Sequence, residues 1–221
     1  MTNMNKKALV IGATGLVGKA LVKQLQAASE FESVTVVVRK ELDEFKVFSK
    51  VSQFVLEDFL LLNDQDVSGY THAFSCLGST IKKAGSKQKF YAIDYEINAH
   101  FADLLQDKET HLLLVSAMGA NSSSIFFYNR VKGLLEDYLK TLTLNKLSIF
   151  HPSLLIGERD EQRLLEGAAQ KIFLLLKDTI KKPLMYKPVT AEQLAHIMII
   201  AANTQMESFK IYDNLAIQTT S

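Results

Sequence analysis

The chain has 221 residues, 48% of them hydrophobic, and carries 25 basic and 24 acidic side chains. This length can bury the core of one α/β domain but leaves little room for two. A net charge of +1, with no basic patch, argues against nucleic acid or an anionic membrane as a partner. Cys76 is the one cysteine, and the five histidines lack zinc-ligand spacing, so we expect a cytoplasmic protein without a metal site.

The N-terminal segment superficially copies a secretory signal peptide. Lys6 and Lys7 precede an apolar run over residues 8–18. Three glycines interrupt that run, Lys19 follows it, and the pattern continues into an amphipathic helix without a cleavage-like end. We therefore expect neither a signal peptide nor a membrane segment, because no stretch approaches the ~18 consecutive apolar residues of a membrane span.

Short apolar runs alternate with longer stretches of helical periodicity over the first 150 residues. The runs predict buried strands at 8–11, 34–38, 51–56, 72–77, 111–116 and 147–150. The patterns between them predict helices, of which the clearest lie at 16–28, 90–106 and 125–140. This alternation is typical of an α/β protein in which helices cover both faces of a parallel sheet. We predict a Rossmann-like, doubly wound parallel sheet.

The pattern loosens after residue 150. We predict a charged loop and an amphipathic helix over 159–182, a helix capped by Thr190 that extends to Ala202, and a late edge strand at 210–212. The expected organisation is a single NAD(P)-binding domain over residues 1–221. It has a cofactor core in 1–150 and a small C-terminal substrate lobe in 151–221.

A glycine-rich loop follows the first predicted strand and precedes the first predicted helix. It consists of Gly12, Ala13, Thr14, Gly15, Leu16, Val17 and Gly18. Gly12 permits a tight turn, Gly15 lets the backbone approach a pyrophosphate, and Gly18 lets the helix pack closely on the strand. The free N–H groups at the helix N-terminus would face the anion. Because strand, loop and helix come in this order, the loop predicts a dinucleotide site rather than a turn without a ligand.

The end of the second predicted strand distinguishes between two cofactors. An acidic residue there binds the 2′-hydroxyl of the adenosine ribose, whereas an arginine meets a 2′-phosphate. Here the strand is followed by Arg39 and Lys40, and no acid comes before Glu41. NADP(H) is therefore favoured over NAD(H). Asp58, past the third strand, is a candidate contact for the adenine, although an aspartate in a loop is more often a turn former.

Three side chains form a candidate catalytic group. Tyr128 and Lys132 are four residues apart and share one face of a helix, a spacing that alone is common. Ser116, twelve residues before Tyr128, ends the fifth predicted strand at the edge that carries the glycine loop. Carbonyl reduction by hydride needs a proton donor, so we expect Tyr128 to be the acid/base, Lys132 to stabilise the tyrosinate and Ser116 to hold the substrate oxygen. Asn98 either adds a water-mediated proton path or is a helix-surface amide.

These motifs resemble the atypical short-chain dehydrogenases, among them the family of the Tat-interacting oxidoreductase and its bacterial NAD(P)-binding relatives. The resemblance covers nearly the whole chain, and beyond the motifs above it rests on residues 76–80, 83–85, 152–159 and 213–217. The family binds NADP(H), which implies that Cys76, Leu77 and Gly78 pass beside the nicotinamide ribose and that 83–85 lie near the active-site mouth. Cys76 itself fits a small buried hydrophobe better than a reactive thiol.

Two positions depart from the pattern of this family. His151 precedes Pro152, where many relatives have an arginine. It either faces the substrate or is satisfied by backbone partners, and we favour the second interpretation. Ala117 follows Ser116, so the neighbouring serine seen in some relatives is absent and Ser116 alone must fill that role.

The motifs leave more than one function open. The favoured function is an NADP(H)-dependent oxidoreductase that transfers a hydride to or from a small carbonyl or alcohol substrate, with residues 159–182 as a lid. The alternative is a non-catalytic NADP(H)-binding regulatory or redox-sensing protein, in which the nucleotide changes the affinity for a protein partner. A sugar-nucleotide epimerase or dehydratase would need a larger C-terminal lobe. We expect a monomer or a homodimer.

Overall fold

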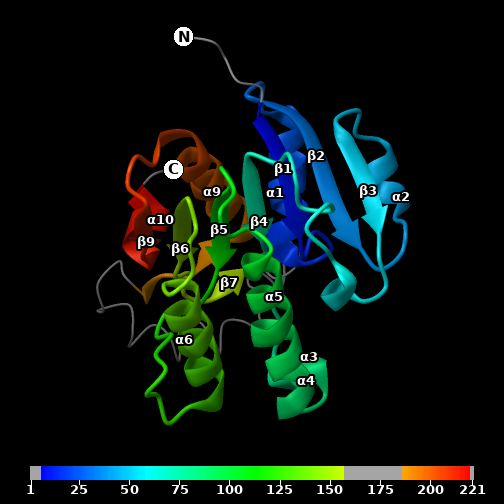
Figure 1. The fold of residues 1–221 in the computed structure, drawn as a ribbon. Coiled ribbons are helices and arrows are strands. Elements are labelled where there is room, and N and C mark those ends of the chain that lie inside the picture. The colour runs from blue at the N-terminus through cyan, green and yellow to red at the C-terminus, as the bar shows by residue number, and fades with distance from the viewer. Residues whose placement is uncertain (1–5, 157–185, 220–221) are drawn as a thin grey trace, which may run out of the picture.

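The computed structural model describes residues 6–156 and 186–219 (Figure 1). Their main sheet has seven parallel strands in the order β3-β2-β1-β4-β5-β6-β9, and a two-stranded sheet joins β7 and β8. The strands are β1 (Lys6–Ile11), β2 (Phe31–Val38), β3 (Val51–Val55), β4 (His72–Ser75), β5 (His111–Val115), β6 (Lys146–Phe150), β7 (Leu155–Ile156), β8 (Val189–Thr190) and β9 (Phe209–Tyr212). The predicted Rossmann-like, doubly wound parallel sheet is confirmed.

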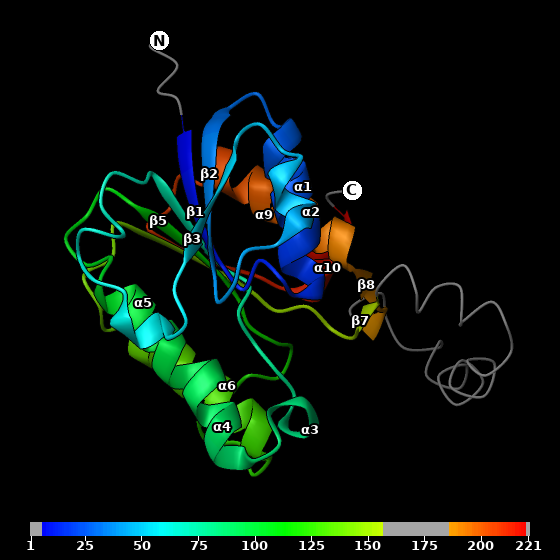
Figure 2. The same cartoon turned by 90° about the vertical axis from the view of Figure 1, so that its right-hand side faces the viewer.

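Helices cover both faces of this sheet. Figure 2 shows α1 and α9 on one side of the strands and α5 and α6 on the other. The α-helices are α1 (Leu16–Ala27), α2 (Asp43–Lys46), α3 (Ile81–Ala84), α4 (Lys87–Tyr91), α5 (Ile97–Asp103), α6 (Phe127–Leu139), α9 (Ala191–Thr204) and α10 (Asn214–Thr219). A 3-10 turn, η1 (Phe59–Leu61), follows β3, and a π-helical turn, η2 (Ala92–Glu96), connects α4 to α5.

The two-sided burial of the central strands explains why the strand sequences are continuously apolar. In β1, Ala8 and Val10 belong to the core on the side of α1 and α9, whereas Leu9 and Ile11 belong to the core on the side of α5 and α6. All four side chains are fully buried. Successive strand residues point to opposite faces, so neither set of side chains on a strand covered on both faces meets solvent.

The described part of the C-terminal segment extends the main domain. Strand β9 pairs in parallel with β6, which confirms the predicted late edge strand. Thr190 caps α9 by accepting a hydrogen bond from the backbone N–H of Gln193 at 3.1 Å, as predicted. The predicted lid at 159–182 lies within residues 157–185, outside the described residues. The substrate lobe therefore stays a prediction.

The predicted helix over residues 90–106 is divided by the π-helical turn η2. The side-chain amide of Asn98 donates to the backbone oxygens of Ile93, at 3.1 Å, and Asp94, at 3.3 Å. The hydroxyl of Ser75, the last residue of β4, donates to the side-chain oxygen of Asn98. Asn98 thus satisfies carbonyl groups that the wider turn releases and fastens them to the sheet. It is 3% exposed, so the interpretation of Asn98 as a surface amide is wrong.

Two buried histidines begin neighbouring strands at the amino edge of the sheet. Nε2 of His72 lies 2.9 Å from the backbone oxygen of Ala202, and Nε2 of His111 lies 2.7 Å from Oγ of Ser148. Burial lowers the pKa of His72 to about 4 and that of His111 to about 3. Both rings are therefore neutral near pH 7, and the folded state resists their protonation.

This pair makes the protein sensitive to acid. Both folded pKa values lie below the ordinary histidine value of about 6.5, so stability is fully present above that pH and is lost as the pH falls toward 4 and 3. The loss should approach ~1.4 kcal/mol per pH unit for each histidine. Urea unfolding at pH 7 and pH 4.5 measures it. His111→Gln should reduce the loss, and His196→Gln, at an exposed position, should not; equal losses in all three proteins would contradict the assignment.

Candidate functional site

The glycine loop packs its backbone against the loop that follows β4. Gly12 has a φ of +76°, and a Cβ atom there would lie 2.4 Å from the backbone nitrogen of Leu77. A Cβ atom on Gly18 would lie 2.2 Å from the oxygen of Gly12, whereas one on Gly15 would find its nearest neighbour at 3.3 Å. No side chain fits at residues 12 and 18 without a backbone shift, which is the tight packing that the loop sequence predicts.

The loop leaves the N-terminus of α1 open to an anion. Gly15 is the N-cap residue and provides no side-chain hydrogen bond to the first turn. Ala13 and Val17 are buried in the core, and Thr14 and Leu16 are exposed beside the N-cap. Backbone N–H groups at a helix N-terminus without a capping side chain suit a phosphate. The residues present therefore fit the pyrophosphate of a dinucleotide.

The ends of β2 and β4 flank this loop. In the register of β1, Ile11 pairs with Val37 on one side and with Ser75 on the other. The exposed Arg39 and Lys40 therefore follow a strand end next to the glycine loop. Asp58 accepts a hydrogen bond from the backbone N–H of Leu60 at 3.0 Å and caps η1, the local role of a turn former.

The loop after β4 contains the predicted ribose-contacting residues. The backbone N–H of Cys76 donates to the oxygen of Ile11 at 3.0 Å, which continues the sheet by one residue. Burial raises the pKa of the Cys76 thiol to about 12, so it stays protonated near neutrality and is a poor nucleophile. Leu77 touches Gly12 through its backbone, and Gly78 comes next in the chain. In Figure 1, the carboxyl end of β4, where this loop begins, points toward the end of the molecule where α4 and α6 lie.

Lys132 forms a buried ion pair that sequence reasoning missed. Its Nζ lies 2.7 Å from Oδ1 of Asp94, and the two side chains are 4% and 0% exposed. The other carboxylate oxygen of Asp94 accepts from the backbone N–H of Ser79 at 2.8 Å. Burial raises the pKa of Asp94 against the opposing effect of Lys132. The signal in the sequence was spacing, because Asp94 lies four residues from both Phe90 and Asn98 and so interrupts a buried helix face.

Gly78 connects this ion pair to the glycine loop. A Cβ atom on Gly78 would lie 3.2 Å from Oδ1 of Asp94 and 3.3 Å from Nζ of Lys132. Leu77, its neighbour in the chain, touches Gly12. The consecutive residues Leu77 and Gly78 therefore lie between the glycine loop and the side chains of Asp94 and Lys132.

Tyr128 lies in the first turn of α6, one helical turn before Lys132. Its ring is partly buried, with its centroid 5.4 Å from that of Phe90. Tyr128, Lys132 and Glu136 are spaced by four residues, which places them along one face of the helix. The expectation that Tyr128 and Lys132 share a face agrees with this helix.

Ser116 lies with Glu136 rather than with Tyr128. Its hydroxyl donates to Oε1 of Glu136, and Nε2 of His151 lies 2.8 Å from the same oxygen. Glu136 comes eight residues after Tyr128 on α6, a rise of about 12 Å along the helix axis. The favoured interpretation of His151, a ring held by backbone partners, is wrong because the ring contacts this carboxylate. The sequence held a signal for Glu136, because this charged residue follows Tyr128 and Lys132 at the same four-residue interval.

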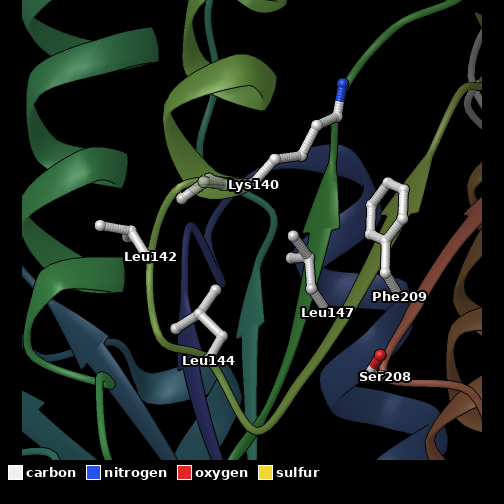
Figure 3. A pocket seen from close by; sticks show the side chains of 7 residues that line it. Lys140, Leu142, Leu144, Leu147, Ser208 and Phe209 are labelled. Carbon is white, nitrogen blue, oxygen red and sulfur yellow. The ribbon is translucent and has the colours of Figure 1, made fainter.

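An apolar pocket lies at the opposite edge of the sheet from the glycine loop. Figure 3 shows its lining side chains near the amino ends of β6 and β9, and its volume is about 390 Å³. The lining residues are Leu139, Lys140, Leu142, Leu144, Leu147, Ser208 and Phe209. All of these residues belong to the end of α6, the amino ends of β6 and β9 and the loops before them, so the pocket is separate from the glycine loop. Among residues 6–156 and 186–219, no cluster of His, Cys, Asp and Glu could hold a metal ion.

Comparisons with known proteins identify relatives of this chain. Residues 7–123 match the family "Semialdehyde dehydrogenase, NAD binding domain". Protein HTATIP2 of Rattus norvegicus is 35% identical over 79% of this chain and 73% of its own length. Protein FMP52, mitochondrial, of Candida albicans is 35% identical over 86% of this chain and 85% of its own length.

A solved structure supports the fold. The human epimerase family protein SDR39U1 (isoform 2), crystallised with NADPH, superposes with a TM-score of 0.63 over 93% of this chain and 72% of its own. Its sequence identity is 15%, so it shows the shared fold and no more.

The relatives correct the expectation of a cytoplasmic protein. FMP52 of Candida albicans, like its counterparts in Scheffersomyces stipitis and Debaryomyces hansenii, is named as a mitochondrial protein. Composition and cysteine usage therefore do not establish a cytoplasmic location for this chain. In the part of the chain that the structure describes, no helix has the length and apolarity needed to cross a membrane.

The matches extend over most of the chain and over most of each relative. They agree with a loop in which Gly12 and Gly18 have no room for side chains and with a seven-stranded parallel sheet. The chain belongs to the family of Protein HTATIP2 and Protein FMP52, and its domain is an NAD(P)-binding Rossmann domain of the oxidoreductase type.

Proposed function

We propose that this protein is an NADP(H)-dependent oxidoreductase of the short-chain dehydrogenase type, acting on a small carbonyl or alcohol. The bound nicotinamide would supply or accept the hydride. Tyr128 would give its phenolic proton to the carbonyl oxygen in reduction, or take up the alcohol proton in oxidation. Lys132 would orient the nicotinamide ribose, and Ser116 would border the substrate.

One observation carries this proposal. Gly12 touches Leu77, and a Cβ atom on the next residue, Gly78, would lie 3.3 Å from Nζ of Lys132, one helical turn from Tyr128. A dinucleotide whose pyrophosphate lies on the glycine loop and whose ribose follows residues 76–78 would reach Lys132. Tyr128 would then lie beside the reacting carbon, where a proton donor is needed.

The preference for NADP(H) rests on charge at the end of β2. Arg39 and Lys40 are exposed next to the glycine loop, where the adenosine ribose of a bound dinucleotide would lie. A guanidinium can make two charge-assisted hydrogen bonds to a 2′-phosphate, which NADP(H) has and NAD(H) lacks.

Asp94 would modify the action of Lys132. The ion pair at 2.7 Å offsets much of the lysine charge and holds Nζ in one place. Asp94 would therefore set the position from which Lys132 contacts the nicotinamide ribose.

Tyr128→Phe tests the acid/base assignment. The variant should lower kcat for NADPH-dependent ketone or aldehyde reduction by about 10²- to 10⁴-fold, the usual contribution of a general acid. The NADPH dissociation constant, measured by fluorescence titration, should change little. Tyr138→Phe is the matched control and should keep its activity. It removes another phenol of α6, whose hydroxyl donates a hydrogen bond to Asp103 of α5. An unchanged kcat in Tyr128→Phe would remove this residue from the mechanism and favour the regulatory alternative.

Arg39→Ala tests the choice of cofactor. The affinity for NADPH should fall by about tenfold or more, because a charge-assisted hydrogen bond contributes ~1.5–3 kcal/mol. The affinity for NADH should hardly change. Lys23→Ala removes an exposed cation of α1 and controls for net charge. Equal losses for both nucleotides would show that Arg39 does not select between them.

Asp94→Leu tests whether Lys132 depends on its carboxylate partner. An unpaired charge would stay buried, so the free energy of unfolding in urea should fall by about 3–5 kcal/mol. Asp94→Leu combined with Lys132→Met should recover most of this loss. Asp137→Asn, which breaks an exposed pair with Lys140, should cost less than about 1 kcal/mol. If the loss in the free energy of unfolding in the double variant equalled the sum of the losses in the two single variants, the two side chains would not be coupled.

A further inference from the structure

A second polar group lies beside the proposed active site, formed by Ser116, Glu136 and His151. Oε1 of Glu136 accepts from the Ser116 hydroxyl and lies 2.8 Å from Nε2 of His151. Ser116 and Glu136 are 5% and 4% exposed, whereas the His151 side chain is 19% exposed. Of the three, the imidazole is the one that a molecule in solution can reach.

The fold brings this group together at the carboxyl edge of the sheet. Val115 pairs with Phe150 in the register of β5 and β6, so the residues that follow them, Ser116 and His151, leave the sheet side by side. The backbone N–H of Ser116 donates to the oxygen of Phe150 at 2.9 Å. Glu136 reaches both from α6, one helical turn after Lys132. The group therefore lies next to Lys132 along α6, on the helix face that also carries Tyr128.

The contacts determine where the protons lie. A serine hydroxyl has one proton, and that of Ser116 is directed at Glu136, so only its oxygen lone pairs are left for a ligand. A carboxylate accepts and cannot donate, so in the hydrogen bond between His151 and Glu136 the proton is on Nε2 of His151. In the neutral ring, Nδ1 is then an acceptor. None of residues 6–156 and 186–219 forms a hydrogen bond with Nδ1 of His151.

We propose that Glu136 is a positioning residue, and that it makes His151 a hydrogen-bond acceptor for a hydroxyl group on the substrate. The proposal rests on the proposed oxidoreductase function and specifies its substrate class. Ser116 and His151 both present lone pairs, so the site should prefer carbonyl compounds that carry a hydroxyl about two helical turns from the carbonyl, such as long-chain hydroxy ketones, over ketones that have none. A plain carbonyl oxygen would find no proton donor in this group, which leaves protonation to Tyr128.

The first test reads the tautomer of His151 without any turnover. The ¹⁵N chemical shifts of the ring in the full-length protein, at a pH where the ring is neutral, should show a protonated Nε2 and an unprotonated Nδ1. Glu136→Gln retains a side-chain oxygen acceptor and should retain this tautomer. Glu136→Met removes the acceptor and should yield a mixture of tautomers. A protonated Nδ1 in the wild-type protein would overturn the proposal.

The second test measures selectivity with NADPH and two probes, 10-hydroxy-2-decanone, whose hydroxyl lies at the far end of the chain from the carbonyl, and 2-decanone. One hydrogen bond corresponds to a preference of about three- to tenfold in kcat/KM for the hydroxy ketone. His151→Phe and Glu136→Met should reduce that ratio to about one. Glu136→Gln and the exposed control Asp137→Asn should keep it. A lost stabilising contact would lower both rates equally, so only a role in substrate recognition changes the ratio.

The outcomes separate this proposal from the function on which it rests. An unchanged ratio in His151→Phe would overturn the role of His151 while ketone reduction itself continued. If His151→Phe does not fold because Glu136 loses a donor, the double variant Glu136→Gln/His151→Phe removes the buried charge and gives the same comparison. Failure of the wild-type protein to reduce either probe would count against the proposed oxidoreductase, and the His151 ring spectrum would still decide the present inference.

Discussion

The ion pair between Lys132 and Asp94 is the interaction on which the candidate site depends. A lysine and an aspartate without water would each destabilise the fold strongly, and their contact at 2.7 Å makes burial of both tolerable. Asp94 also accepts from the backbone of Ser79. The helical segment of Asp94, helix α6 and the loop after β4 are thereby held at one point. The position of Lys132 relative to that loop follows from electrostatics rather than from apolar packing alone.

A steric constraint at the glycine loop complements this electrostatic one. Gly12 and Gly18 leave no space for a Cβ atom, and the atoms that would be hit belong to the backbone of the adjoining loop and turn. Backbone cannot move aside as a flexible side chain can. The loop after β4 is therefore restrained on one side by the glycines and on the other by the ion pair, through consecutive residues Leu77 and Gly78. Such double restraint suits a surface that must match an extended dinucleotide.

Local patterns predicted the sheet well because its signals are local. Continuous apolar runs such as residues 8–11, followed by a glycine loop and a helical stripe, indicate a strand covered on both faces and then a helix. The π-helical turn was not predictable in this way, because it depends on an Asn98 side chain that is held by Ser75 on a distant strand. The partners of Lys132 and Ser116 were missed for the same reason. In the sequence, Asp94 and Glu136 appear only as charged residues on otherwise buried helix faces. Their partners come from other parts of the chain, so only the tertiary structure shows what each one binds.

Helix α6 shows how a single face can serve two chemical purposes. Tyr128, Lys132 and Glu136 follow one another at intervals of four residues, and each has a different environment. Tyr128 is partly exposed and packs its ring against Phe90. Lys132 forms an ion pair with Asp94, and Glu136 accepts hydrogen bonds from Ser116 and His151. Tyr128 and Lys132 carry O–H or N–H protons that they could donate to a ligand, whereas the protons of Ser116 and His151 are directed at Glu136. The ability to donate and the ability to accept are therefore separated by position along this face. A substrate that carries a carbonyl near Tyr128 and a hydroxyl about two helical turns away would complement both ends.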